Sequence, residues 1–171
     1  QALQRVSIDQ KVPFYYETNV GAGLPIIDTL KNLIDSGDSI RSIVAVLSGS
    51  LNFIFDTYDG RTSFKTVVEA AMEGGYTEPD PRIDLSGLDV KRKLLILARE
   101  SGYALELEDI ATEAFLPEGA LETADVSAFL QLLEANEAHF KSLYEEAHAQ
   151  QKKLKFVAEL KVLSDHNVEA K

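Results

Sequence analysis

The segment from residue 74 to residue 93, GGYTEPDPRIDLSGLDVKRK, strongly constrains the fold because it separates two stretches of helical periodicity. The pair Gly74 and Gly75 suits the end of the first helix, and Pro79 and Pro81 limit how the following turn can move. The segment also concentrates charge, in Glu78, Asp80, Asp84 and Asp89 together with Arg82, Lys91, Arg92 and Lys93. A rigid turn with this much charge between two helices is typical of a functional site.

Helical periodicity recurs along the rest of the chain. Apolar residues at spacings of three and four predict helices over residues 24–37, 51–57, 63–73, 87–101 and 124–151. Pro25 suits the first turn of the first helix, and Ser63 suits the N-cap of the third. Residues 1–11 are polar without a convincing period and resemble the tail of an earlier element, so we expect the chain to start at a cut.

Strand signals alternate irregularly with these helices. Residues 14–18, 40–47 and 110–115 are rich in β-branched or aromatic residues and predict strands. Residues 154–162 alternate apolar and charged side chains, as a half-exposed strand does, and residues 164–167 predict a hairpin turn before a return strand. Because helices of unequal length mix with strands without regular βαβ alternation, we expect an α+β fold with an open mixed β-sheet covered by helices.

Composition narrows the class of protein. A chain of 171 residues can bury one sizeable core, so we expect a single domain over residues 1–171. The lack of cysteine excludes disulfides and thiolate catalysis, and three scattered histidines argue against a histidine metal cage. A net charge of −11 argues against general binding to nucleic acid or to an anionic membrane. Without a membrane-spanning apolar run or a leader, a cytoplasmic protein is expected.

Asp89 and Lys93 are the first candidate pair for binding or catalysis, because residues four apart in a helix share one face. On an arbitrary helix such a surface ion pair contributes only about 0.2–0.5 kcal/mol. Here the helix follows a turn that carries further carboxylates at Glu78 and Asp84. Carboxylates that converge on one ammonium suit a ligand amine, or hold Lys93 as a proton donor or acceptor. A capping turn solvated by its own charges also explains Asp84, so both interpretations stay open.

Two other turns are rich in small residues. Residues 17–24, ETNVGAGL, lack the GxGxxG spacing and the P-loop lysine, which argues against dinucleotide binding by this loop alone. Several main-chain carbonyls beside the carboxylate of Glu17 suit a hard cation. Residues 48–52, SGSLN, follow a predicted strand, and their backbone amides either face a ligand or form a plain tight turn.

Three of these blocks resemble homoserine dehydrogenase, in its substrate-binding and dimerisation domain. They are YETNVGAGLPII at residues 16–27, LSGSLNFIF at residues 47–55 and GYTEPDPRIDLSGLDVKRK at residues 75–93. The run KLLILARESGYALELEDI resembles the dehydrogenase half of bifunctional aspartokinase/homoserine dehydrogenases. The resemblance implies an enzyme that reversibly oxidises L-homoserine to L-aspartate 4-semialdehyde with NAD or NADP, within threonine, methionine and isoleucine synthesis.

The resemblance also implies roles by position. Lys93 corresponds to the catalytic acid/base lysine. Glu78 and Asp89 correspond to carboxylates that bind homoserine, and Asp84 lies close to them in the motif. The resemblance also places Tyr76, Gly49 and Ser50 beside the substrate. It places Gly75 beside the nicotinamide of the cofactor. A monovalent cation, usually sodium, is implied at Glu17 with the carbonyls of Val20, Ala22 and Leu24.

The family pattern extends beyond this chain. It implies a nucleotide-binding Rossmann domain before residue 1 and a C-terminal return segment, so the fold is expected to be truncated at both ends. We therefore expect a folded, inactive fragment that forms a homodimer through its sheet and binds neither nucleic acid nor membrane. The alternative is a non-catalytic amino-acid-binding or assembly domain, whose carboxylates bind a ligand without chemistry.

Overall fold

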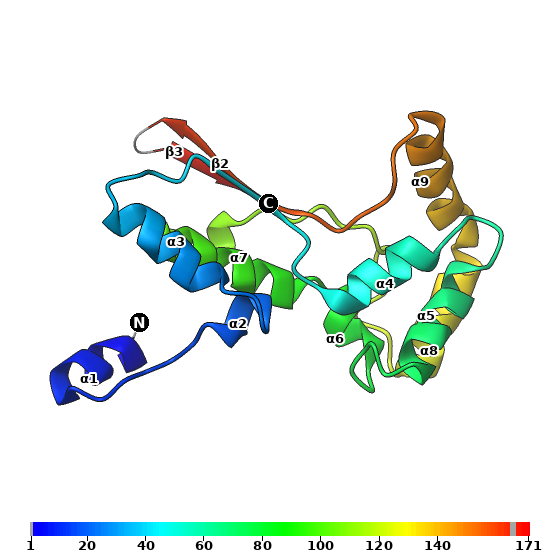
Figure 1. The fold of residues 1–171 in the computed structure, drawn as a ribbon. Helices are drawn as coiled ribbons and strands as arrows, with labels where there is room; N and C mark the ends of the chain where they lie inside the picture. Colours follow the sequence, from blue (N-terminus) through cyan, green and yellow to red (C-terminus); the bar gives the residue numbers. More distant parts are fainter. Residues whose placement is uncertain (1, 165–166) are drawn as a thin grey trace.

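A computed structural model describes residues 2–164 and 167–171 (Figure 1). In chain order the elements are α1 (Ala2–Gln10), α2 (Thr18–Gly21), α3 (Ile26–Asp35), β1 (Ser42–Ala45), α4 (Gly49–Thr57), α5 (Phe64–Glu73), α6 (Pro81–Leu85), α7 (Leu88–Glu100), the 3-10 turn η1 (Leu107–Asp109), α8 (Val126–Ala135), α9 (Glu137–Ala149), β2 (Ala158–Ser164) and β3 (Asn167–Ala170). Helices α2 and α3 pack on α7, which also contacts β2, whereas α5 packs against α4, α8 and α9.

The sheet has the order β1-β2-β3, and both strand pairs in the described residues are antiparallel. Ile43 pairs with Leu160, and Leu160 pairs in turn with Ala170, so β2 is the central strand. The α+β class with an open sheet is confirmed, although the described sheet is antiparallel where a mixed one was expected. The predicted return strand is β3, while the turn before it lies partly outside the described residues.

Two predicted strands are wrong. Residues 14–18 form no strand, because they pair with none of the described strands and the chain enters α2 at Thr18. Residues 110–115 lie outside the sheet, where the amide of Ala111 donates to the carbonyl of Ala170 at 2.9 Å. Residues 2–10, which showed no convincing period, form the helix α1, and most of residues 3–10 are exposed.

The predicted long helix over residues 124–151 is two helices that meet at Asn136. The Asn136 side chain donates to the carbonyl of Leu132 at 2.9 Å and so closes the last turn of α8 with its own amide. The strand predicted from residue 154 begins only at Ala158, where pairing with β1 starts.

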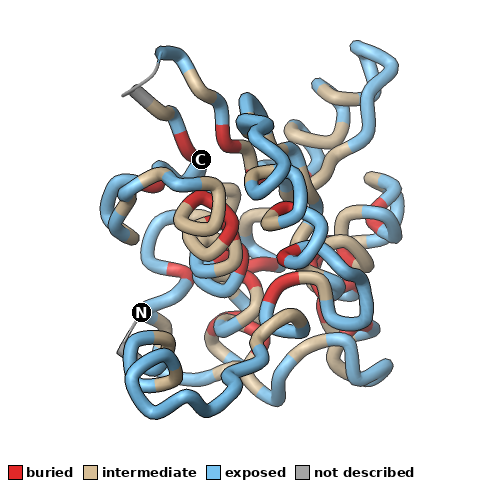
Figure 2. Tube along the Cα trace, turned by 60° about the vertical axis from the view of Figure 1, so that its left-hand side comes forward, coloured by how far each residue is buried: buried red, intermediate tan, exposed pale blue. Residues whose placement is uncertain are grey.

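One hydrophobic core joins the elements that carry the predicted site. It contains Leu51 and Ile54 of α4, Leu85 of α6 and Leu94 of α7, each at most 1% exposed. Figure 2 shows the buried positions gathered in the middle of the trace, while the N-terminal segment is exposed. This shared core fixes α4, α6 and α7 relative to one another.

Candidate active site

The N-terminus of α4 is the point on which the predicted site residues converge. Ser48 is the N-cap residue, and its hydroxyl accepts a hydrogen bond from the amide of Leu51 at 3.2 Å. Gly49 and Ser50 begin the helix, and Ser50 is buried with 6% of its surface exposed. Three separate segments of the chain contact residues 47–53, which include this stretch.

Lys93 reaches the stretch from α7. Its ammonium lies 2.6 Å from Oδ2 of Asp89 and donates to the carbonyl oxygen of Leu47 at 2.9 Å. The Lys93 side chain is 22% exposed, whereas that of Asp89 is 63% exposed. The predicted i,i+4 ion pair is therefore present, and the bond to Leu47 directs the ammonium toward the start of α4.

Asp84 reaches the stretch from α6. Its Oδ1 accepts the Ser50 hydroxyl at 2.8 Å, and its Oδ2 accepts the backbone amide of Glu78 at 2.8 Å. The hydroxyls of Ser48 and Ser50 lie 2.9 Å apart, which extends the chain of hydrogen bonds to the N-cap. Since a carboxylate offers about four lone pairs, Asp84 also retains acceptor capacity for a substrate. The Asp84 carboxylate thus joins the turn that carries Glu78 to α4.

Tyr76 is the third contact. Its ring stacks on Phe53 of α4, with centroids 4.0 Å apart and an interplanar angle of 14°. Gly75 precedes it with φ of 70°, a conformation that glycine adopts without strain. A Cβ at Gly74 would lie 2.9 Å from the Tyr76 ring, so the chain has no side chain where the ring passes. Tyr76 remains 53% exposed and is available to a ligand.

The predicted cation residues lie apart from this site, around α2: Glu17 is its N-cap residue, Val20 lies within it, and Ala22 and Leu24 follow it before α3. Oε1 of Glu17 accepts the amide of Ile27 at 2.7 Å, and Oε2 accepts the amide of Asp28 at 2.8 Å. Burial by itself raises the pKa of Glu17, but hydrogen bonds from the backbone amides of Asp28 and Ile27 outweigh it and lower the pKa below its ordinary value. Glu17 therefore stabilises the N-terminus of α3 as an anion.

Both carboxylate oxygens of Glu17 and the carbonyl of Leu24 already accept backbone amides, the latter from Ile26 at 2.9 Å, so a hard cation here would share these oxygens with the hydrogen bonds. No group of three or more His, Cys, Asp or Glu side chains that would hold a metal occurs in residues 2–164 and 167–171. A cation near Glu17 would therefore depend on main-chain oxygens, and those of Val20, Ala22 and Leu24 are of the type that hard cations bind. Ala22 takes the unusual φ of 51°, which marks a tight turn at the centre of these carbonyls.

The structure thus brings several of the predicted residues to one end of α4 and adds others. It joins Lys93, Asp89, Asp84 and Ser50 around α4, while the cation residues stand apart. Sequence reasoning missed the carbonyl of Leu47 and the ring of Phe53. No local signal marks either one, since each becomes relevant only through a partner distant in the chain. A cavity of about 350 Å³ between α7 and residues 154–159 is lined by none of the predicted site residues.

These features define a class of protein: an α+β domain that holds a lysine ammonium and several carboxylates near the start of one helix. The chain belongs to the homoserine dehydrogenase family, because residues 25–171 match the family model described as homoserine dehydrogenase. This confirms the resemblance seen in its three sequence blocks.

Named relatives support the same family assignment. The bifunctional aspartokinase/homoserine dehydrogenase of Haemophilus influenzae is 47% identical over 147 residues, which are 86% of this chain and 18% of that protein. The homoserine dehydrogenase of Schizosaccharomyces pombe is 39% identical over 168 residues, which are 95% of this chain and 45% of that protein. The chain therefore spans less than half the length of these relatives.

Solved structures share the fold. A Candida auris protein of unknown function has a TM-score of 0.84 and 33% identity, and the match covers 98% of this chain and 50% of that one. A homoserine dehydrogenase from Thiobacillus denitrificans has a TM-score of 0.73 at 23% identity, over 99% of this chain and 34% of that one, which supports the fold alone. Among the described residues, no helix has both the length and the apolar character needed to cross a bilayer.

Proposed function

We propose that this chain is the substrate-binding part of an enzyme that reversibly oxidises L-homoserine to L-aspartate 4-semialdehyde with NAD or NADP. The observation that carries the proposal is the placement of Lys93, which is held between Asp89 and the carbonyl of Leu47 at the start of α4. Beside it, Asp84 joins Ser50 to the turn that carries Glu78. Membership of the family supports the same reaction.

The residues divide the work as follows. Glu78 and Asp89 bind the substrate ammonium, with Asp84, Ser50 and the backbone at Gly49 around the substrate. Lys93 is the acid/base: it takes the proton of the substrate hydroxyl and returns it in the reverse direction. Gly75 and the neighbouring Tyr76 would lie beside NAD(P), which would supply the acceptor for the hydride of the hydroxyl-bearing carbon. One proton and one hydride thus leave the alcohol as the aldehyde forms.

The remaining parts of the proposal concern assembly. A Rossmann domain outside residues 1–171 supplies most of the cofactor site, so the isolated chain turns over little or no homoserine. Two copies pair through the sheet, where β1 is an edge strand with Val44 66% exposed. A monovalent cation, most simply Na⁺, binds at Glu17 with the carbonyls of Val20, Ala22 and Leu24. The enzyme works in threonine and methionine synthesis, and its compartment is the cytoplasm.

The test uses a longer protein that joins this chain to its nucleotide-binding domain. Lys93→Ala abolishes homoserine-dependent formation of NAD(P)H, followed by absorbance, and leaves homoserine binding measurable by calorimetry. A non-catalytic amino-acid-binding domain is the second candidate, favoured by the exposed carboxylates of Glu78 and Asp89. In that case neither the wild type nor the variant produces NAD(P)H, although both bind the amino acid.

A further inference from the structure

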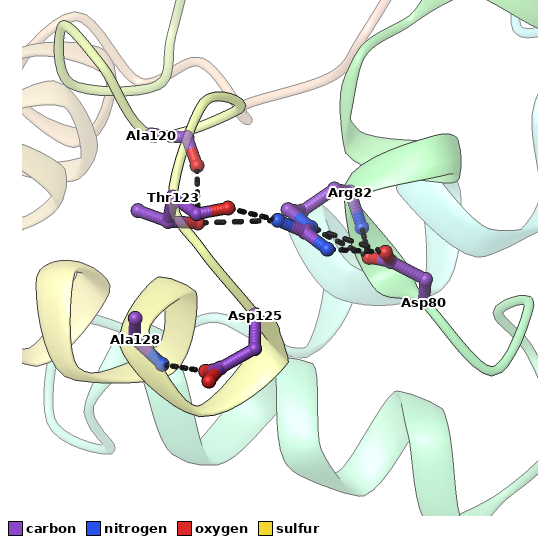
Figure 3. A network of polar contacts seen from close by, with 6 residues as sticks. All are labelled: Asp80, Arg82, Ala120, Thr123, Asp125 and Ala128. Carbon is purple, nitrogen blue, oxygen red and sulfur yellow. Dashed lines mark hydrogen bonds and ion pairs between the residues drawn. The ribbon is translucent and has the colours of Figure 1, made fainter.

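Arg82, on α6, bridges two segments that no sequence motif connects (Figure 3). On one side its Nε and Nη2 form a forked pair with Asp80, at 2.9 Å to Oδ1 and 2.6 Å to Oδ2. On the other side its Nη1 donates to the carbonyl oxygen of Thr123 at 2.5 Å. The side chain is only 19% exposed, so both contacts are partly shielded from water.

Residues 120–125, which Arg82 contacts through Thr123, are held in place by contacts of their own. The Thr123 hydroxyl donates to the carbonyl of Ala120 at 3.0 Å, and Ala120 is 1% exposed in the main core. Two residues later, Asp125 caps α8 by accepting the amide of Ala128 at 2.8 Å (Figure 3). Residues 120–125 are therefore a firm anchor, and the bond to Thr123 restrains the other end of the guanidinium.

Helix α6, which Arg82 fastens to residues 120–125, has little stability of its own. Helix α6 has five residues, too few to be stable alone. Asp80 is its N-cap and accepts the amide of Arg82 at 3.0 Å, so the ion pair and the cap share one carboxylate. The hydrogen bonds from Arg82 hold the pKa of Asp80 below its ordinary value. Glu78 lies two residues before this cap, and Asp84 lies four residues after it.

We propose that Arg82 is a positioning residue, which sets the place of Glu78 and Asp84 by fastening α6 to residues 120–125. The inference rests on the proposed function, in which Glu78 binds the substrate ammonium. Arg82 contacts neither the Glu78 carboxylate nor the Asp84 carboxylate, and it acts on both through Asp80 and α6. Lys93 has independent anchors on α7 and at Leu47, so loss of Arg82 disturbs substrate binding more than proton transfer.

A matched control lies elsewhere on the molecule. Arg99 of α7 also bridges a carboxylate and a main-chain carbonyl, with Nη2 at 2.6 Å from Glu106 Oε2 and Nε donating to Leu105 at 3.0 Å. Its side chain is 28% exposed, close to the exposure of Arg82. None of these partners belongs to the proposed site. Arg99→Met therefore removes a similar set of contacts without touching α6.

The kinetic test compares Arg82→Met with Arg99→Met in the longer protein that contains the nucleotide-binding domain. Arg82→Met raises the KM for homoserine about tenfold, as the loss of one well-placed charged hydrogen bond does, while kcat and the KM for NAD(P) change little. Arg99→Met leaves the KM for homoserine unchanged. Arg82→Lys recovers only part of the loss, because a single ammonium cannot form the forked contact. Equal KM changes in the two Met variants, or none in either, overturn the proposal.

A structural readout separates this inference from the proposed function. The amide of Glu78 donates to Asp84 at 2.8 Å, so we expect hydrogen exchange at this amide to report the placement of the turn. Arg82→Met speeds that exchange and Arg99→Met does not; unchanged exchange in Arg82→Met overturns the proposal. A wild-type enzyme without hydride transfer contradicts the proposed function, and the exchange still decides the positioning role. If Arg82→Met does not fold, Arg82→Lys replaces it in both measurements.

Discussion

The hydroxyl of Ser50 donates to Oδ1 of Asp84 at 2.8 Å, across a sequence separation of 34 residues. Ser50 lies in the first turn of α4, and Asp84 lies on α6. The bond joins two of the segments that form the proposed site, and it is shielded because Ser50 is only 6% exposed. The stability of the protein and its affinity for substrate should therefore both depend on this contact.

Ser50→Ala removes the donor and leaves one Asp84 oxygen without its partner. We expect the free energy of unfolding to fall by about 1.5–3 kcal/mol, the range for a hydrogen bond to a charged group. Urea denaturation measures the loss. Ser86→Ala is the control, because the Ser86 hydroxyl binds neutral backbone groups, the carbonyl of Ile83 and the amide of Leu88, and its loss should cost less than loss of a bond to a carboxylate. An equal effect of the two substitutions contradicts the special role of Asp84.

Gly87 begins α7 in a left-handed conformation with φ of 70°, and a Cβ there would lie 2.7 Å from the ring of Phe156. Gly87→Ala therefore combines backbone strain of about 1–2 kcal/mol with a steric clash. Gly102→Ala isolates the backbone strain, since Gly102 has φ of 90° and nothing lies within 4 Å of the added Cβ. In thermal denaturation, Gly87→Ala should lower Tm more than Gly102→Ala, and Phe156→Leu should restore part of the difference.

Glu137, at the start of α9, accepts the Tyr58 hydroxyl at 2.8 Å and the amide of Phe64 at 2.7 Å. Burial and the contact with Glu137 raise the pKa of Tyr58. Glu137→Ala should lower the free energy of unfolding by about 1–3 kcal/mol, because it leaves two shielded donors unpaired. Glu134→Ala removes a nearby acid that is 63% exposed in its pair with Lys65, and it should cost less than about 1 kcal/mol. Chemical denaturation of both variants checks the ranking.

Acid lability should depend on Glu17. Its folded pKa is depressed, so the unfolded chain binds the proton more readily, and the stabilisation is present above the unfolded pKa of about 4.3. It is lost as the pH falls through the folded pKa. Glu17→Gln should therefore flatten the fall in stability with decreasing pH below about pH 5. Urea midpoints across the acid range measure this, with Glu118→Gln, an exposed acid, as the control. A slope that stays unchanged in Glu17→Gln contradicts the prediction.

Much of the helical structure was predictable because its signals are local. The Ser63 cap and the Gly74–Gly75 stop predicted residues 63–73, and α5 spans Phe64–Glu73. Residues 87–101 were likewise predicted, and α7 spans Leu88–Glu100. The strands at residues 14–18 and 110–115 were wrong because β-favouring composition does not supply a partner strand, and pairing in a sheet is not local. The break at Asn136 depends on one side chain that binds the preceding turn.

The sequence by itself determined the family, the α+β class and the pairing of Asp89 with Lys93, since positions four apart meet on any helix. Only the tertiary structure decided that Lys93 binds the carbonyl of Leu47, that Asp84 joins Ser50 to the Glu78 turn, and that Arg82 reaches Thr123. These contacts link residues distant in the chain. They exist because one buried core holds α4, α6 and α7 together, and the packing of a core is set by long-range contacts that no local period encodes.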